Sequence, residues 1–303
     1  MNQLKGYRMH YYKYITRSLI GLAALLLSAC GEQPNAPTTT GDSGTGFAQA
    51  QQQGIATLPV IYVPAPGFAY QNEAGELTGV AVEIMHDFKR WFERYHGITM
   101  EFDFVAETDW SRMYARVRDA EGGVFGLGNV TITDERLREL QFSPAYLYNV
   151  ALLITPDHIE TISEPAKFSD YVPDLKPLAF AGTLHEERIR ELRDTHQPNA
   201  DIVQVTSNQA VIDGVAAGHY SYVDAYNYHR ALEEGIELTY HPEFNLDGEQ
   251  FGIIMPHSND WSTLITAFFA AEGGYLTTQR YAQLLRAHLG DGVAEILLEA
   301  APL

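Results

Sequence analysis

Apolar residues in the first half of the chain follow two different periods. A continuous apolar run at residues 58–63 and an alternating run at residues 98–105 predict strands. Between them, apolar side chains three and four positions apart predict an amphipathic helix whose aromatic stripe belongs to the core: Ile84, Met85, Phe88, Trp91, Phe92 and Tyr95. Asp109 is placed to cap a second helix, which ends near Ala120, and residues 124–127 predict a third strand. This order of strands and helices predicts a parallel sheet with right-handed crossovers.

The second half of the chain repeats this order. An apolar run at residues 150–155 predicts a strand that leaves the first lobe, and residues 251–255 predict one that returns to it. Between them the sequence predicts strands at 177–181, 201–205 and 220–223, and helices at 183–194, 207–217 and 225–234. Two further helices, at 259–273 and 277–298, close the fold.

We therefore predict an α/β protein with two lobes, each a mainly parallel sheet flanked by helices. Residues 58–152 together with 252–303 form lobe 1, and residues 153–251 form lobe 2. The two strands that cross between the lobes act as a hinge on which the lobes close around a ligand. The length of 303 residues, 46% of them hydrophobic, suits two domains rather than one.

The first 57 residues differ from the rest of the chain. Four cations precede an apolar stretch at residues 19–27 that is too short to span a bilayer as a mature helix: Lys5, Arg8, Lys13 and Arg17. This pattern is typical of a secretory signal peptide, which we assign to residues 1–29. Residues 30–57 are rich in Gly, Gln, Thr, Pro and Ala, and predict a flexible tether.

Cys30 is the only cysteine in the chain, so an intramolecular disulfide is impossible. Residues 27–30, with the letters LSAC, resemble a bacterial lipoprotein box, in which the cysteine becomes the lipid-bearing first residue after cleavage. The alternative is an ordinary signal peptide with a cysteine there by chance. Gly31, the next residue, leaves open which membrane the lipid enters.

The net charge of −19 and the pI near 4.9 argue against a nucleic-acid partner, which requires a basic face. We interpret the acidity as a contribution to solubility. No repeat of fixed period is visible, which sets solenoids and propellers aside. The sequence also has no GxSxG, phosphate-loop or dinucleotide fingerprint, so hydrolase, nucleotide and hydride chemistries lack support.

Histidines are numerous, but their spacing does not suit a metal site. The eleven histidines show neither an HExxH motif nor a cluster with ligand-like spacing. We expect His185, His219 and His229 at the surface or at an edge. The sequence thus predicts no metal and no cofactor.

Arg136 is the most informative cation. Thr133, followed by two acids, predicts a helix start, yet Arg136 puts a positive charge into the first turn, where the helix dipole disfavours it. One interpretation is functional: the guanidinium, the free N–H groups of the helix and the Thr131 hydroxyl form a site for a carboxylate. The other is a surface ion pair between Arg136 and Glu135 or Glu139.

Several polar or aromatic residues follow the predicted strands of lobe 1. Ligands of open parallel sheets bind outside the carboxyl ends of the strands, so residues at these ends are expected to share one site. They are Asn129, Thr131, Arg136, Trp110 and the loop at residues 64–67.

Lobe 2 offers candidates with two interpretations each. Residues 183–186 form a capping box, so Thr183 either caps a helix or, together with Gly182, approaches a ligand. Asp224 ends a strand and either points into the cleft or caps the next helix; the sequence alone favours the cap. In lobe 1, Trp110 likewise either closes a helix start or forms a pocket wall.

Segments along the chain, taken in order, resemble the bacterial solute-binding proteins of family 3, which are type 2 periplasmic binding proteins of the polar amino acid type. They are GELTGVAVEIMHDF at residues 75–88, DW at 109–110, NVTITDER at 129–136, FSPAY at 142–146, AFAGT at 179–183, SNQAVIDGVAAGH at 207–219 and FGIIMPHSNDW at 251–261. The resemblance covers nearly all residues from Leu58 onward. It implies a two-lobed fold that captures a small polar carboxylate, such as an amino acid, for an ABC-type importer.

The resemblance also implies roles for individual residues. Trp110 forms a wall of the pocket, Gly182 and Thr183 belong to a loop that faces the cleft from lobe 2, and Asp224 meets the ligand's ammonium group. The family more often carries this acid about two residues later, where the chain has Tyr226.

The opposite wall of the pocket also departs from the family. Where many relatives have an aromatic residue, the chain has Pro64 and Ala65, with Phe68 and Tyr70 only later. We take Phe68 as the candidate for this wall.

For the protein as a whole we expect a monomer without a nucleic-acid partner. Lipid on Cys30 would hold it at a membrane, facing the periplasm or the cell exterior, where it serves an ABC permease. Two alternatives remain open. One is a cleft enzyme of the same fold, such as a cyclohexadienyl dehydratase, with Asp224 as its acid. The other is an envelope sensory or partner-docking module, although the retained Thr131 and Arg136 argue against a fully degenerate pocket.

Overall fold

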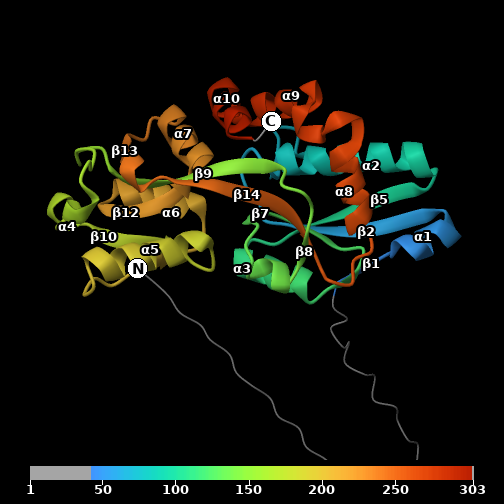
Figure 1. Ribbon diagram of the computed structural model, residues 1–303, viewed down its shortest axis with the longest axis horizontal. Coiled ribbons are helices and arrows are strands. Elements are labelled where there is room, and N and C mark those ends of the chain that lie inside the picture. The colour runs from blue at the N-terminus through green and yellow to red at the C-terminus, as the bar shows by residue number, and fades with distance from the viewer. Residues whose placement is uncertain (1–41, 302–303) are drawn as a thin grey trace, which may run out of the picture. The chain divides into compact units, whose positions relative to one another are not determined.

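One sheet runs through both lobes of the chain that the computed structural model describes, residues 42–301 (Figure 1). Its hydrogen-bonded order is β11-β10-β12-β9-β14-β7-β2-β5, with β13 paired to β9 and β8 to β14. In the middle of this order, β9 (Leu147–Pro156) and β14 (Leu246–Met255) pair antiparallel and cross between the lobes. The predicted two-lobed α/β fold with two crossing strands is confirmed, and the sheets of the two lobes are joined into one.

Lobe 1 has the predicted parallel arrangement. Strand β2 (Ile55–Tyr62) lies between β5 (Thr99–Ala106) and β7 (Phe125–Thr131) and is parallel to both. Helices α2 (Val80–His96) and α3 (Trp110–Arg118) connect these strands. Strand β7 runs on past its predicted end, so the candidate residues of the NVT segment belong to the last part of the strand.

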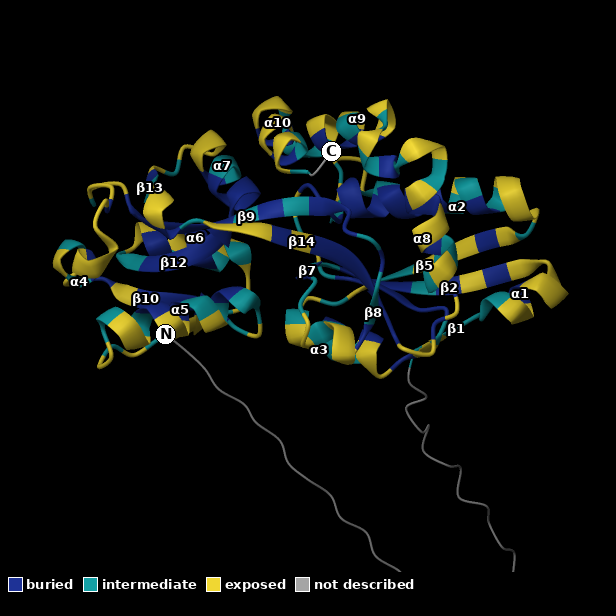
Figure 2. Cartoon of the chain, viewed as in Figure 1, coloured by how far each residue is buried: buried dark blue, intermediate teal, exposed yellow. Residues whose placement is uncertain are grey.

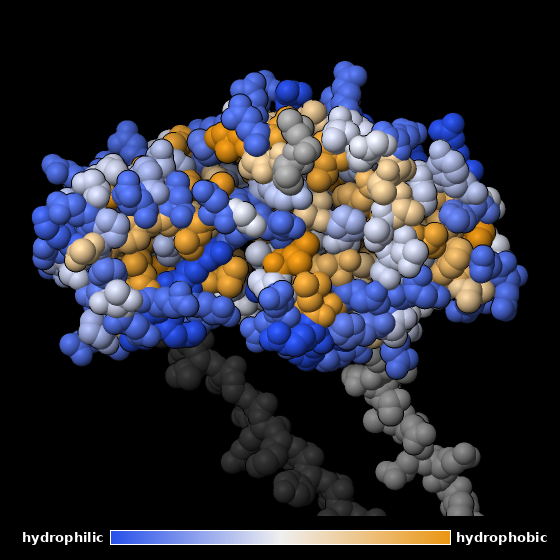
Figure 3. All heavy atoms as spheres, viewed as in Figure 1, coloured by the Kyte–Doolittle hydropathy of each residue, from blue (hydrophilic) through white to orange (hydrophobic). Residues whose placement is uncertain are grey.

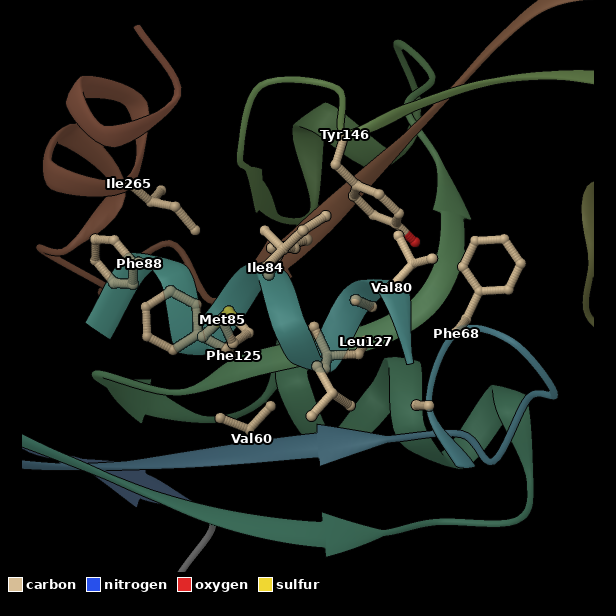
Figure 4. Packing of buried hydrophobic residues seen from close by; sticks show 14 of the residues in the cluster. Val60, Phe68, Val80, Ile84, Met85, Phe88, Phe125, Leu127, Tyr146 and Ile265 are labelled. Carbon is tan, nitrogen blue, oxygen red and sulfur yellow. The ribbon is translucent and has the colours of Figure 1, made fainter. Parts of the chain in front are cut away.

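Helix α2 covers one face of this sheet. Ile84 and Phe88 are fully buried, and the Phe88 ring lies edge-on to that of Phe125 of β7, with 6.3 Å between centroids (Figure 4). The predicted aromatic stripe is therefore core, with one correction: Tyr95, in the last turn, is 59% exposed. Its ring packs against Trp91 at 5.4 Å between centroids rather than against the sheet.

Residues 42–57 are ordered, which corrects the prediction of a flexible tether over residues 30–57. They include α1 (Phe47–Gln53) and the first residues of β2. The Phe47 ring packs edge-on against Trp261, with 5.4 Å between centroids, and Ala50 is fully buried. The polar composition concealed this helix because so few apolar side chains anchor it.

The predicted signal peptide, Cys30 and the first part of the predicted tether lie outside the described residues. Within residues 42–301, no helix is both long enough and apolar enough to cross a membrane. Hydrophilic residues cover most of the face drawn in Figure 3, in keeping with the net charge of −19.

Lobe 2 is built on three strands. Strand β10 (Lys176–Phe180) pairs parallel with β11 (Val203–Val205) and β12 (His219–Asp224), and β12 pairs antiparallel with the crossing strand β9. The three helices that follow these strands are α5 (Leu184–His196), α6 (Asn208–Ala216) and α7 (Ala225–Glu233). The predicted order of strands and helices is confirmed.

The C-terminal part of the chain returns to lobe 1. It forms α8 (Ser262–Ala270), α9 (Gln279–Leu289) and α10 (Asp291–Ala300), of which α10 contacts α7 of lobe 2 (Figure 1). The smaller elements are β1 (Ser43–Gly44), β3 (Tyr70–Gln71), β4 (Leu77–Thr78), β6 (Glu121–Gly122), β8 (Gln141–Phe142), α4 (Phe168–Tyr171) and β13 (Leu238–Tyr240).

Most of β9 and the second half of β14 are buried (Figure 2). The two strands also bury polar residues, among them Asn149 of β9 at 1% exposure and Glu249 of β14 at 5%. Burying an amide or a carboxylate is unfavourable unless it is hydrogen-bonded. The partners of both residues lie at the cleft between the lobes.

Candidate functional site

A cavity of about 220 Å³ lies between the lobes, and residues of both lobes line it. Six of the eight predicted ligand contacts are among them: Trp110, Asn129, Thr131, Arg136, Thr183 and Asp224. The first four come from the carboxyl ends of lobe 1 strands or from the helix start beside them, as expected for an open parallel sheet. The other two come from the ends of strands in lobe 2.

Arg136 faces this cavity from lobe 1. Its Nη1 donates to the Thr131 carbonyl at 3.0 Å, and the guanidinium lies over the Trp110 ring, 5.2 Å from its centroid. Among the described residues, no carboxylate lies within ion-pair distance of Arg136, so the interpretation as a surface ion pair is wrong. Glu139 instead accepts a hydrogen bond from Tyr114 Oη at 2.8 Å.

Arg136 is largely buried, and burial affects the pKa of its guanidinium. Desolvation lowers its pKa, while nearby tyrosine and glutamate side chains raise it by a smaller amount. A guanidinium remains protonated in proteins, so the site keeps its positive charge. A buried cation without an anionic partner favours the binding of an anion.

The helix predicted at Thr133 is a single 3₁₀ turn, Arg136–Arg138. The Thr133 hydroxyl accepts a hydrogen bond from the Arg136 N–H at 3.2 Å, as a capping residue does. A turn this short has no row of free amides. The predicted carboxylate site therefore rests on the guanidinium rather than on the end of a helix.

Trp110 joins the start of α3 to the sheet and also lies at the cavity. Its Nε1–H donates to the carbonyl of Gly128, in the middle of β7, at 3.0 Å. One face of the ring stacks on Tyr114 at 5.4 Å, and the indole also lines the cavity.

Asn129 is one of two non-glycine residues with a positive φ in the described chain, at 51°. Its Oδ1 accepts from Tyr146 Oη at 2.6 Å, and its Nδ2 donates to Tyr226 Oη at 2.8 Å. Tyr226 belongs to α7, so this bond joins lobe 2 to lobe 1. The residue that replaces the family's usual acid is therefore a contact between the lobes.

Phe68 requires a correction. It is 1% exposed, packs in the lobe 1 core near Tyr146 (Figure 4), and its ring meets that of Tyr226 at 4.5 Å. It does not line the cavity, because Pro64, Ala65 and Pro66 form that wall instead.

Gly182 lies at the contact between the lobes rather than in the cavity. Its φ is 77°, and a Cβ at this position would be 2.2 Å from Ser111 Oγ of lobe 1. Its N–H donates to Glu186 Oε2 at 2.7 Å, one residue before the N–H that a capping box would use. The predicted capping box is therefore not formed, because the Thr183 hydroxyl donates to the Phe180 carbonyl at 2.8 Å and the Thr183 N–H donates to the same carbonyl.

Asp224 ends β12 and is 8% exposed. The preference for a capping role is wrong, since its side chain makes no cap hydrogen bond to α7. Its Oδ1 accepts from Asn149 Nδ2 at 2.6 Å and lies 3.2 Å from His185 Nε2. Both of these contacts involve Oδ1, and Tyr226 is a further neighbour of the carboxylate.

The network behind Asp224 reaches both crossing strands. Asn149 of β9 also donates to Glu249 Oε2 of β14 at 2.9 Å, and Glu249 is paired with Arg188 of α5. The Asp224 carboxylate is thus joined to the two crossing strands through the Asn149 amide, which donates to both Asp224 and Glu249. Sequence reasoning missed Asn149 and Glu249; the available signal was a polar residue immediately before the apolar run at residues 150–155.

His185 was also misplaced by the sequence. It is 7% exposed and lines the cavity, whereas a surface or edge position was expected. His219 and His229 are half-buried. Among the described residues, no group of three or more metal-ligating side chains comes together.

Comparison with known proteins places this geometry in a family. The sequence matches the bacterial extracellular solute-binding proteins, family 3, over residues 60–291, and a search of curated proteins gave no match. Among solved structures, a mutant of ArgBP from T. maritima is similar, with a TM-score of 0.62 at 13% identity, covering 80% of this chain and 99% of that one.

Two further structures are similar. A substrate-binding protein of an ABC uptake transporter from Streptococcus pneumoniae with bound histidine has a TM-score of 0.60 at 17% identity, covering 82% of this chain and 97% of its own. The ancestral amino acid-binding protein AncCDT-1, a precursor of cyclohexadienyl dehydratase, has a TM-score of 0.59 at 15% identity, with 80% and 98% covered. At these identities the likeness shows the fold alone, while the family match spans most of the sequence. The chain belongs to family 3 of the bacterial extracellular solute-binding proteins and has their two-lobed fold.

Proposed function

We propose that the protein captures a single amino acid between its lobes. The observation that carries this proposal is that Arg136 of lobe 1 and Asp224 of lobe 2 line one cavity. An amino acid carries a carboxylate and an ammonium group, which match these two charges. A guanidinium binds a carboxylate through paired, charge-assisted hydrogen bonds.

The surroundings of the two charges support a small ligand. The cavity of about 220 Å³ is smaller than the ~300–1,000 Å³ that is usual for drug-sized ligands. Thr131 and Thr183 add hydroxyl groups from opposite lobes, and Trp110 adds an aromatic wall. A ligand that contacts both lobes stabilises the closed form relative to the open one.

Delivery of the ligand to an ABC-type importer belongs to the same proposal, since the family and the similar protein from S. pneumoniae support it. We further propose that lipid on Cys30 anchors the protein to a membrane, facing the periplasm or the cell exterior, and that it acts as a monomer. The letters LSAC before residue 31 support the anchor. Mass spectrometry of the N-terminal peptide from expressing cells tests it.

Thermal unfolding of the purified protein with a panel of amino acids tests the ligand class. One member of the panel is expected to stabilise the protein by about 2.7 kcal/mol at a hundredfold excess over the dissociation constant. Arg136→Ala is expected to abolish this shift, whereas Arg94→Ala, which removes an exposed arginine of α2, retains it. A flat response across amino acids and small organic acids would refute the proposal.

A second candidate is an enzyme of the same fold, and the Asp224–His185 pair favours it. Both side chains line the cavity and are in hydrogen-bond contact, so they are able to exchange a proton with a ligand. Turnover of prephenate or arogenate that is lost in Asp224→Asn would establish the dehydratase. Tight amino acid binding without turnover of either compound would leave binding as the function.

A further inference from the structure

A second arginine lines the same cavity as Arg136 and Asp224. Arg230 lies in the last turn of α7 in lobe 2, and the sequence gave no reason to single it out. It therefore approaches the ligand from the lobe opposite Arg136. The cavity has a guanidinium on each side.

Arg230 lacks partners for its buried donors. Its Nε and Nη1 are inaccessible to solvent and make no hydrogen bond with any residue in the described part of the chain. Glu234 forms an i,i+4 ion pair with Arg230, 3.6 Å from Nε, which is too long for a hydrogen bond and is weakened by solvent because the Glu234 side chain is half-exposed. Buried N–H groups of a charged side chain are costly when unpaired, which favours a side-chain conformation in which they reach an acceptor.

The charges that line the cavity do not balance. Arg136 and Arg230 are positive, and Asp224 is the only carboxylate among the lining residues. The cavity thus has an excess positive charge inside a chain whose net charge is −19. A neutral zwitterion pairs with Arg136 and Asp224 and leaves Arg230 with only the half-exposed Glu234 as a partner. A ligand with one ammonium group and two carboxylates pairs with all three.

We infer that the ligand is an acidic amino acid and that Arg230 binds its side-chain carboxylate. This inference rests on the proposed function, because it assigns the α-carboxylate to Arg136. Thr206, Ser207 and Asn208, at the start of α6, line the same cavity and add polar groups on the side of lobe 2. The start of a helix is also the positive end of its dipole, which suits an anion. A dicarboxylate that reaches from Arg136 to Arg230 holds the two lobes together.

Isothermal titration calorimetry with acid and amide pairs tests this inference. The ligands are L-glutamate with L-glutamine, and L-aspartate with L-asparagine, because each pair has nearly the same shape and differs in one charge. The protein is expected to bind one acid at least about tenfold more tightly than its amide, the difference between a charged and a neutral hydrogen-bond partner. Arg230→Met is expected to remove this preference while binding of the amide remains.

Two variants serve as controls. Arg230→Lys retains the positive charge and is expected to retain part of the preference, whereas Arg94→Met removes an exposed arginine and leaves the preference intact. Circular dichroism confirms that each variant is folded. An amide or a basic amino acid bound as tightly as the acid would overturn the inference while the proposed function stands. Loss of amide binding in a folded Arg230→Met would also overturn it, and failure to bind any amino acid would overturn the proposed function itself.

Discussion

The two lobes hold their halves of the site in place by different means. In lobe 1, Arg136 is fixed by a backbone carbonyl and by the rings of Trp110 and Tyr114. In lobe 2, Asp224 is held by side chains, Asn149 and His185. The half-site of lobe 1 therefore follows from the fold of that lobe, while the half-site of lobe 2 depends on a polar network that includes the hinge.

The cores of the lobes differ in size. Lobe 1 packs a large cluster rich in aromatic rings, which includes Phe88 and Phe92, and a smaller cluster that includes Ile61 on the other face of its sheet. Lobe 2 has two smaller clusters on the two faces of its sheet, with Leu153 of β9 in one and Leu152 in the other. It also buries two histidines among them, His185 and His241. We expect lobe 1 to act as the rigid platform and lobe 2 to be the more sensitive to pH and to polar substitutions.

His241 offers the largest test of this difference. It is fully buried after β13, where its Nδ1 accepts from Ile162 N at 3.1 Å and its Nε2 lies 2.9 Å from Thr155 Oγ1. Burial lowers the pKa of His241 from 6.5 to about 4. In the unfolded chain it binds a proton near pH 6.5, so stability is full above that pH and falls as the pH drops toward 4. The expected loss from this residue is up to about 3 kcal/mol.

Urea unfolding at pH 7 and at pH 4.5 measures this loss. The matched pair is His241→Gln and His158→Gln, because His158 is an exposed histidine of the same lobe. Between pH 7 and pH 4.5 the free energy of unfolding should fall less in His241→Gln than in the wild type. In His158→Gln it should fall by as much as in the wild type. The same pH dependence in both variants would show that lobe 2 owes no acid sensitivity to its buried histidine.

The sequence predicted most of the fold because its signals are local. The apolar periods of α2 and β9 are visible within a few residues. The unusual position of the cation Arg136, which indicated the site, is likewise visible from its immediate neighbours. Helix α1 escaped prediction because its contact with Trp261 joins positions that are far apart along the chain.

The candidate site was only partly predictable, because some of its contacts join positions that are far apart along the chain. Its lobe 1 half lies close together in the sequence, whereas the partners of Asp224 come from β9 and α5. Phe68 was misplaced because Tyr226, from the other lobe, packs on its ring. Arg230 carried no local signal, because its position at the cavity and the lack of hydrogen bonds at its Nε and Nη1 depend on what surrounds it after folding. Contacts between the lobes are therefore the part that only a structure reveals.

Gly182 offers the next test, of whether the lobes must approach closely to bind. Gly182→Ala would bring a Cβ to 2.2 Å from Ser111 Oγ and would place alanine at a φ of 77°. Gly235→Ala is the matched control, because Gly235 has a φ of 81° and nothing within 4 Å of its Cβ position. Both variants should lose about 1–2 kcal/mol of stability from the backbone strain.

Ligand affinity separates these two variants. We expect Gly182→Ala to bind the ligand at least about tenfold more weakly than Gly235→Ala, because the contact with Ser111 disfavours the closed form. Calorimetry measures the difference, and adding Ser111→Gly to Gly182→Ala should restore most of the affinity. Equal affinities in the two alanine variants would mean that the approach at Gly182 has no part in binding.

Tyr226 offers the smallest and most direct test, because its hydroxyl forms a hydrogen bond between the lobes. Tyr226→Phe removes the bond from Asn129 Nδ2, whereas Tyr228→Phe removes a bond to the Leu238 carbonyl inside lobe 2. Each hydrogen bond contributes about 1 kcal/mol, so only Tyr226→Phe should weaken ligand binding, by about fivefold. Its ligand-free form should also show a larger radius of gyration in X-ray scattering. If both variants bind and scatter like the wild type, then the lobes are held together by ligand alone, and Tyr226 merely fills space beside Phe68.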